Sequence, residues 1–105
     1  MTSFGDVAAI ESDGELPLLV FLHGIQGTKE LFLPILKEPF VRKHATLAID
    51  FLGFGESSVS HDFDYSISSF ACAVEEILHP RASAVVLIGH SLGGMVATRL
   101  LESGL

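Results

Sequence analysis

The sequence predicts an α/β fold, a mostly parallel sheet with flanking helices, in a single domain over residues 1–105. Short runs of β-branched residues and leucine alternate with longer segments of helical periodicity, which is the pattern of strands joined by helices. Apolar residues make up 49% of the chain and charged residues 18%, so the chain can bury a core of ordinary size. No internal repeat or linker divides it.

Four short apolar runs are predicted as strands. The run LLVFL, Leu18–Leu22, is apolar at every position, as expected of a strand buried on both faces of a sheet. The other three are Val7–Glu11, which precedes a turn over Ser12–Glu15, then Ala45–Asp50 and Ala84–Ile88.

Three helices are expected between and after these runs. One runs from Thr28, a candidate N-cap, to Leu36, although Pro34 must lie in its first turns or shorten it. The second covers Ser66–Leu78, where apolar residues recur on one side with helical spacing. The third follows Ser91 almost to the end of the chain. Its apolar members are Met95, Val96, Leu100 and Leu101.

Charge and cysteine content exclude several classes of protein. The formal net charge is −7, and no basic cluster exceeds the pair Arg42 and Lys43, so neither nucleic acid nor an anionic membrane is an expected partner. The longest apolar runs are far shorter than the roughly 20 residues of a membrane span. The single cysteine, Cys72, cannot form an internal disulfide, and the first residues do not resemble a secretory signal. A cytoplasmic protein is expected.

Residues 88–94, IGHSLGG, hold one serine between glycines, directly after the last predicted strand. Ser91 is the centre of a GxSxG pattern at a turn so sharp that its backbone is strained and its hydroxyl projects outward. A side chain at Gly89 or Gly93 would collide where strand and helix meet. The helix that begins here points its free N–H groups toward the serine, so the Leu92 N–H can bind a developing oxyanion.

Two further motifs follow the two preceding central strands. HGIQG, His23–Gly27, comes directly after Leu18–Leu22, and its tight backbone can turn the Ile25 N–H toward the same oxyanion. DFLGFGES, Asp50–Ser57, follows the next strand. Each motif therefore stands at the end of a predicted strand.

This order of motifs resembles the serine hydrolase branch of the α/β-hydrolase fold superfamily, over about residues 7–105. The pattern there is an HG loop, a DxxGxGxS loop and a GHSxGG nucleophile elbow. The resemblance implies that Ser91 is the nucleophile and that the backbone N–H groups of Leu92 and Ile25 form the oxyanion hole. The residues implied to shape the surrounding loops are His23, Gly24, Asp50, Gly53, Gly55, Ser57, Gly89 and Gly93. Leu52 departs from the proline or arginine often found at its position.

The implied function is a serine hydrolase that acts on a carboxylic ester or related small acyl substrate through an acyl-serine intermediate, with no cofactor and no metal. Serine at the elbow, rather than aspartate, argues against the epoxide hydrolase and dehalogenase branches. In this family the acid and the histidine follow the serine. Here Glu102 is the only acid after Ser91, and no histidine follows it.

His23 and His90 are weaker alternatives for the base. The resemblance implies that these residues are the N-terminal half of the fold and that further strands carry the acid and the histidine. Without such strands Ala84–Ile88 would be an exposed apolar sheet edge, which invites self-association or a complementing C-terminal half. The chain alone is then expected to be almost inert.

Other interpretations of the sequence remain. The rival function is a non-catalytic remnant that works by binding, through that edge or its acidic surface. The polar side of the second helix, with Cys72, Glu75, Glu76 and His79, is favoured as a solvated face over a metal site. A dinucleotide loop at GFGES is disfavoured because Ser58 stands where a third glycine is needed. Phe51, Phe54 and Met95 suggest an apolar cleft.

Overall fold

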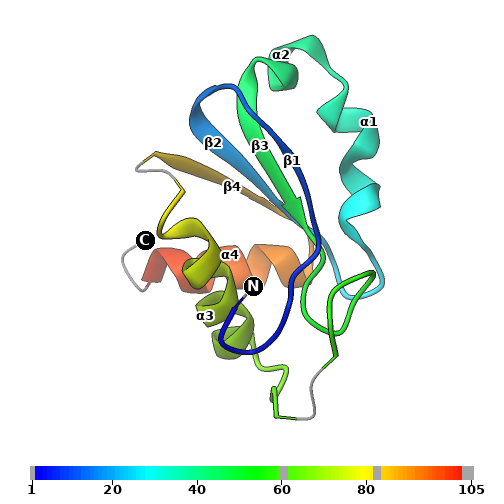
Figure 1. Cartoon of the computed structure of the whole chain (residues 1–105), viewed down its shortest axis with the longest axis vertical. Helices are drawn as coiled ribbons and strands as arrows, with labels where there is room; N and C mark the ends of the chain where they lie inside the picture. The colour runs from blue at the N-terminus through cyan, green and yellow to red at the C-terminus, as the bar shows by residue number, and fades with distance from the viewer. Residues whose placement is uncertain (1, 60–61, 82–83, 103–105) are drawn as a thin grey trace.

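The computed structural model of the chain describes residues 2–59, 62–81 and 84–102, and it shows one four-stranded sheet between helices (Figure 1). The strands are β1 (Ala9–Ser12), β2 (Glu15–Leu22), β3 (His44–Ile49) and β4 (Val85–Gly89). Their order across the sheet is β1-β3-β2-β4. β2 is parallel to both β3 and β4, and β1 is antiparallel to β3. The predicted α/β class with a mostly parallel sheet is confirmed.

Alternation along β2 builds the core on both faces of the sheet, as its continuous apolar run predicts. Val20 and Leu22 point to one face, where they pack with the helices α3 (Ile67–Leu78) and α4 (Leu92–Glu102). Phe21 points to the other face and packs against Phe32. The sheet is therefore covered on both sides, which fixes the register of its central strands.

The strand boundaries differ from the prediction mainly in β1 and β2. β1 begins at Ala9 rather than Val7, because the preceding Ala8 donates to the Ser57 hydroxyl and accepts from the Asp50 amide. β2 begins earlier, at Glu15, but its pairing with β3 shifts between Glu15 and Leu19, around a proline that lacks an N–H. Regular pairing therefore starts near the predicted position.

The single helix predicted from Thr28 to Leu36 is wrong. The structure has a 3₁₀ helix, η1 (Lys29–Phe32), then α1 (Leu33–Leu36) and α2 (Pro39–Arg42). Pro34 lies in the first turn of α1 and Pro39 begins α2. At these positions the missing N–H costs no helical hydrogen bond, but within a longer helix it would interrupt the bonding. Thr28 precedes η1, but its side chain makes no capping hydrogen bond.

The two later helices match the prediction closely. Ser66 caps α3 by accepting a hydrogen bond from the Ser69 amide at 3.1 Å, and the predicted apolar side of the helix faces the core. α4 begins directly after Ser91 and buries Val96 and Leu100. Met95 and Leu101, two of the apolar residues expected in this helix, lie outside its buried side, because they are 55% and 65% exposed. In the described part of the chain, no helix combines the length and the apolar character that a bilayer span requires.

Candidate active site

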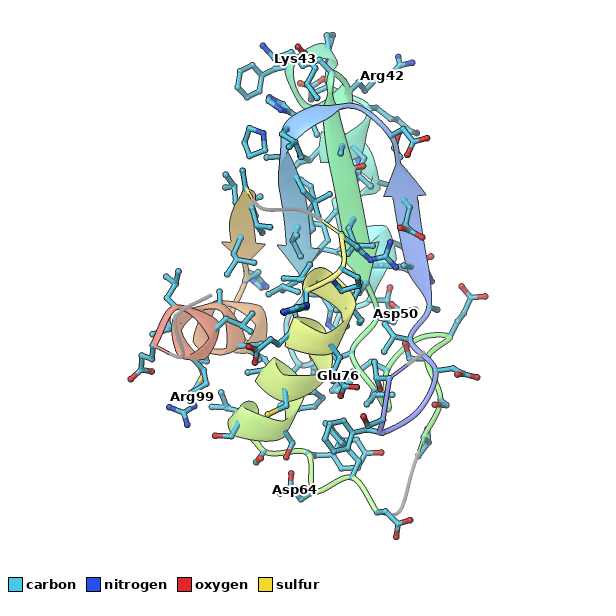
Figure 2. The ribbon with its side chains drawn as sticks, turned by 60° about the vertical axis from the view of Figure 1, so that its left-hand side comes forward. Arg42, Lys43, Asp50, Asp64, Glu76 and Arg99 are labelled. Carbon is cyan, nitrogen blue, oxygen red and sulfur yellow. The ribbon has the colours of Figure 1, made fainter. Side chains whose placement is uncertain are left out.

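Three loops meet at one edge of the sheet because β2, β3 and β4 run parallel and end on the same side. They are residues 23–28 after β2, 50–57 after β3 and 90–91 after β4. Figure 2 shows Asp50 at this carboxyl end of β3, at the opposite end of the sheet from Arg42 and Lys43. Carboxyl ends of parallel strands are where open α/β sheets bind ligands.

Ser91 occupies a left-handed corner between β4 and α4, with φ of 57°. The chain enters through a hydrogen bond from the His90 amide to the Leu22 carbonyl, 3.0 Å long. It leaves through the first turn of α4, where the Met95 amide donates to the Ser91 carbonyl at 3.1 Å. This backbone conformation is unfavourable for a residue with a Cβ and is typical of strained functional turns. Ser91 is exposed, as the predicted outward hydroxyl requires.

Replacing Ser91 with glycine is expected to stabilise the chain by up to about 1 kcal/mol, because glycine adopts positive φ without the Cβ strain. The matched control is Ser68→Gly on the exposed side of α3, which should destabilise by about 0.5 kcal/mol through loss of helix propensity. Urea denaturation of both variants measures the difference. A loss of stability in Ser91→Gly equal to that in Ser68→Gly would contradict a strained corner.

Close backbone contacts explain the glycines that flank Ser91. A Cβ on Gly89 would lie 2.5 Å from the Gly93 carbonyl carbon and oxygen. A Cβ on Gly93 would overlap the carbonyl oxygen of Leu22 in the neighbouring strand. Gly94, by contrast, has room for a Cβ, whose nearest neighbour would be the Gly89 oxygen at 3.6 Å. The helix therefore packs directly on the strands at Gly93.

The loop after β2 turns back against this corner. The Gly27 amide donates to the Gly24 carbonyl at 3.0 Å, which closes a tight turn around Ile25. A Cβ on Gly24 would lie 3.2 Å from the Ser91 Cβ, so the backbone of the loop lies against the serine. Neither the Ile25 amide nor the Leu92 amide donates a hydrogen bond to an acceptor among residues 2–59, 62–81 and 84–102. Both donors are therefore available to a bound ligand.

A pocket of about 340 Å³ opens between the loop and the corner, and we call it the Ser91 pocket. Its lining residues are Gly24, Ile25, Gln26, Gly27, Leu31, His90 and Ser91. Among the described residues, no aspartate, glutamate, lysine or arginine lines this pocket. The sequence did not predict Leu31 and Gln26 as lining residues. Leu31 was assigned to the predicted helix, and no role was assigned to Gln26 within HGIQG.

The predicted apolar cleft of Phe51, Phe54 and Met95 is wrong, because none of the three lines the Ser91 pocket. Phe51 is buried in the core, where its ring packs 5.1 Å from that of Phe70. Phe54 is half-buried against the same cluster, and Met95 faces outward from α4. Aromatic residues in this motif therefore support the loop rather than the pocket.

His23 is excluded as the catalytic base by its hydrogen bonds. Its Nε2 accepts from the Phe51 amide at 3.0 Å, and its Nδ1 lies 2.6 Å from the Gly24 carbonyl oxygen. A carbonyl can only accept and an amide can only donate, so Nδ1 carries the proton and the lone pair of Nε2 is in use. The ring is fully buried. His90 lines the Ser91 pocket, and no described hydrogen bond joins its ring to Ser91.

A buried ion network supports the loops behind the pocket, and sequence reasoning missed its centre, Lys29. The Lys29 ammonium lies 2.8 Å from Asp50 Oδ2, 2.6 Å from Glu56 Oε1 and 3.0 Å from Glu30 Oε2. The Lys29 side chain is 5% exposed and the Asp50 side chain 0%. The Lys29 and Glu56 amides also donate to the Asp50 carboxylate, at 2.7 and 2.9 Å.

These contacts oppose the effect of burial on both charges. Burial alone would raise the pKa of the Asp50 carboxyl, but hydrogen bonds from the Lys29 ammonium and the two amides hold this pKa below its usual value. Burial alone would lower the pKa of the Lys29 ammonium, but hydrogen bonds to Asp50, Glu56 and Glu30 raise it above its usual value. Both groups are charged at neutral pH, so Lys29 is not a nucleophile or a base.

Loss of the Asp50 charge is expected to destabilise the chain in acid. Because the pKa of Asp50 is lower in the folded chain, the folded state binds fewer protons, and this contribution to stability is lost as pH falls below about 4. The difference in free energy of unfolding between wild type and Asp50→Asn should therefore be large at pH 7 and shrink below pH about 4. Urea denaturation at each pH measures it, and a constant difference would contradict the ion pair.

The polar side of α3 shows no metal centre. Within the described ranges, no three or more histidine, cysteine, aspartate or glutamate side chains are grouped so that they could hold a metal ion. Glu76 accepts from the hydroxyl and the amide of Ser3, at 2.6 and 3.0 Å, and Cys72 is exposed. These side chains therefore face solvent or the N-terminal segment.

The family model described as the alpha/beta hydrolase fold matches residues 17–103. LipZ of Mycobacterium tuberculosis, which is named as a hydrolase, is 32% identical over 105 residues, which are 99% of this chain and 36% of LipZ. The mouse protein named sn-1-specific diacylglycerol lipase ABHD11 is 35% identical over 94 residues, which are 87% of this chain and 30% of the relative. This chain therefore spans about a third of the length of these relatives.

A solved structure shares the same arrangement. The N-acyl homoserine lactonase AidH, in complex with N-butanoyl homoserine, superposes with a TM-score of 0.89 and 31% identity, over 97% of this chain and 38% of AidH. The superposition therefore extends over nearly the whole of this chain.

Proposed function

The chain belongs to the α/β-hydrolase fold family, and on that premise we propose that it provides the nucleophile and the oxyanion hole of a serine hydrolase. Ser91 attacks the carbonyl carbon of a carboxylic ester or related small acyl substrate, and a base takes the hydroxyl proton. The acyl C–O bond then breaks, the alcohol leaves with that proton, and an acyl-serine forms. The amides of Leu92 and Ile25 hold the negative oxygen of the tetrahedral intermediate.

One observation carries the proposal. The exposed serine in its left-handed corner shares a pocket with the tight loop that carries the Ile25 amide, and the Leu92 amide directly follows the serine; neither amide has an acceptor among the described residues. An oxyanion hole needs such donors fixed before the reaction, so that no reorganisation accompanies the growth of charge. A lining without carboxylate, lysine or arginine side chains among the described residues suits a neutral acyl group, and the AidH complex holds an acyl compound.

The catalytic histidine and its acid belong, in this proposal, to sequence outside these 105 residues. A serine hydroxyl needs a base to take its proton, and the buried His23 cannot do so. Residues Leu92–Glu102 contain one carboxylate, Glu102, and no histidine. The chain alone is then limited to the part of catalysis that the oxyanion hole and binding provide.

An activated short ester, p-nitrophenyl butyrate, tests the proposal. We expect a butyryl group on Ser91, found by mass spectrometry of peptides, which persists because no positioned base activates water for deacylation. Free imidazole should speed its release by about tenfold or more, as a poorly positioned substitute for the base. Butyryl groups spread over exposed side chains, with none enriched on Ser91, would refute the proposal.

The rival function, binding without catalysis, is favoured by one observation. Among the described residues β4 pairs only with β2, and Val86 on this edge strand is 43% exposed. A second copy of the chain or a complementing C-terminal segment could add a strand there. Under this alternative Ser91→Ala would leave every biological activity unchanged, whereas the hydrolase proposal requires its loss.

A further inference from the structure

The loop that carries Ile25 is held at both of its ends by two consecutive residues, Asp50 and Phe51. At the N-terminal end of the loop, the His23 ring accepts from the Phe51 amide at 3.0 Å and donates to the Gly24 carbonyl at 2.6 Å. At the C-terminal end of the loop, Lys29 binds the carboxylate of Asp50. The segment from His23 to Lys29 is thus fastened to the first two residues after β3.

Both the backbone amide and the side-chain ammonium of Lys29 bind Asp50. Its amide donates to Asp50 Oδ1 at 2.7 Å, and its ammonium donates to Asp50 Oδ2 at 2.8 Å, so one carboxylate fixes both the backbone and the side chain. The ammonium also donates to Glu56 Oε1 at 2.6 Å, which ties it to the far end of the loop after β3. A compact ammonium with three donors suits three separate carboxylates better than a planar guanidinium does.

Asp50 is itself confined, so it can serve as a reference point for the loop. Its side chain is fully buried, a Cβ on Gly55 would overlap its carboxylate, and its carbonyl accepts from the Ser57 hydroxyl at 2.6 Å. Removing the ammonium would leave this carboxylate with two amide donors in a buried site. An unpaired buried charge draws in water or moves toward solvent, and either response displaces the backbone at residue 29.

We propose that Lys29 is a positioning residue of the active site, which holds the loop of residues 23–28 so that the Ile25 amide stays on the Ser91 pocket. The inference rests on the proposed function, because it assigns Lys29 a purpose in that reaction. Lys29 does not line the Ser91 pocket. It acts through Asp50, and its effect on chemistry is transmitted by the position of one amide.

Lys29→Met tests the inference, with Lys37→Met as the matched control, since Lys37 is exposed. In Lys29→Met, exchange of the Gly27 and Lys29 amides, which are hydrogen-bonded in the wild type, should rise at least tenfold, while exchange in α3 stays as in wild type. The rate at which a fluorophosphonate modifies Ser91 should fall about 100-fold, the usual cost of one lost oxyanion donor. Lys37→Met should change neither rate. A role confined to stability would leave the Ser91 rate unchanged wherever exchange in α3 shows a folded chain.

Lys29→Arg covers the case in which Lys29→Met does not fold. It keeps the positive charge beside Asp50, but its planar fork cannot reproduce the three-way contact. We expect a folded variant with about a tenfold slower reaction at Ser91, and a wild-type rate would overturn the inference. Unchanged exchange of the Gly27 and Lys29 amides in a folded Lys29→Met would overturn it as well. If the fluorophosphonate does not modify Ser91 selectively in the wild-type chain, the proposed function is refuted. The exchange data would still show whether Lys29 holds the loop.

Discussion

Gly93→Ala is expected to lower the free energy of unfolding by at least about 4 kcal/mol, enough to unfold most of the chain. The new Cβ would overlap the carbonyl oxygen of Leu22, which belongs to the central strand β2 and cannot move without breaking the sheet. The helix α4 would have to lift off the strand, taking the buried Val96 and Leu100 with it. Urea denaturation followed by circular dichroism measures the loss.

The neighbouring glycine provides the control for this prediction. Gly94→Ala adds the same methyl group one residue later in the same helix, where its nearest neighbour would be 3.6 Å away. Because alanine favours the helix over glycine, Gly94→Ala should stabilise the chain by up to about 1 kcal/mol. Equal effects of the two substitutions would contradict the close packing of α4 on β2.

Ser91 is expected to react with a fluorophosphonate about 10³ times faster than an exposed serine of the same chain. A serine protease that has lost a member of its triad keeps about 10³ to 10⁴-fold acceleration over water, which comes from the oxyanion hole and binding alone. On the proposed function Ser91 keeps the same two contributions, whereas Ser68 on α3 is an exposed serine that does not line the Ser91 pocket. Peptide mass spectrometry over time gives both rates from one sample.

Unfolding the chain gives the control for this second prediction. In concentrated urea the loop and the corner unfold, so the proposed oxyanion hole is lost and the rate at Ser91 should fall to that at Ser68. Because both serines are in the same peptide chain, the ratio does not depend on the concentration or the age of the probe. A ratio near one in the folded chain would contradict a preformed oxyanion hole.

Local patterns predicted the parts of the fold that obey a single periodicity. The run Leu18–Leu22 predicted a strand buried on both faces, and its side chains alternate between two core clusters. Ser66 predicted the start of α3 because a capping side chain acts within three residues. The sharp corner at Ser91 was predictable because it needs glycines at fixed offsets.

Features that depend on long-range contacts were not predictable in this way. Lysine is ordinarily a surface residue, so nothing in the sequence distinguishes Lys29. Only the fold brings Asp50, from 21 residues away, to its ammonium. Phe51 and Phe54 stand beside the motif glycines and suggested a cleft, but the core behind the loop takes their rings. The single helix predicted from Thr28 was wrong because Pro34 lies in the first turn of a new helix, α1, after the 3₁₀ turn of η1.

The most direct measurement of the central claim is the amide spectrum of the chain before and after Ser91 is phosphonylated. The phosphonyl oxygen imitates the oxyanion, so the amide protons of Ile25 and Leu92 should move strongly downfield as they donate to it, while that of Ile67 at the start of α3 stays in place. If the Ile25 and Leu92 signals do not move in a chain that carries the phosphonate on Ser91, the two amides do not form an oxyanion hole.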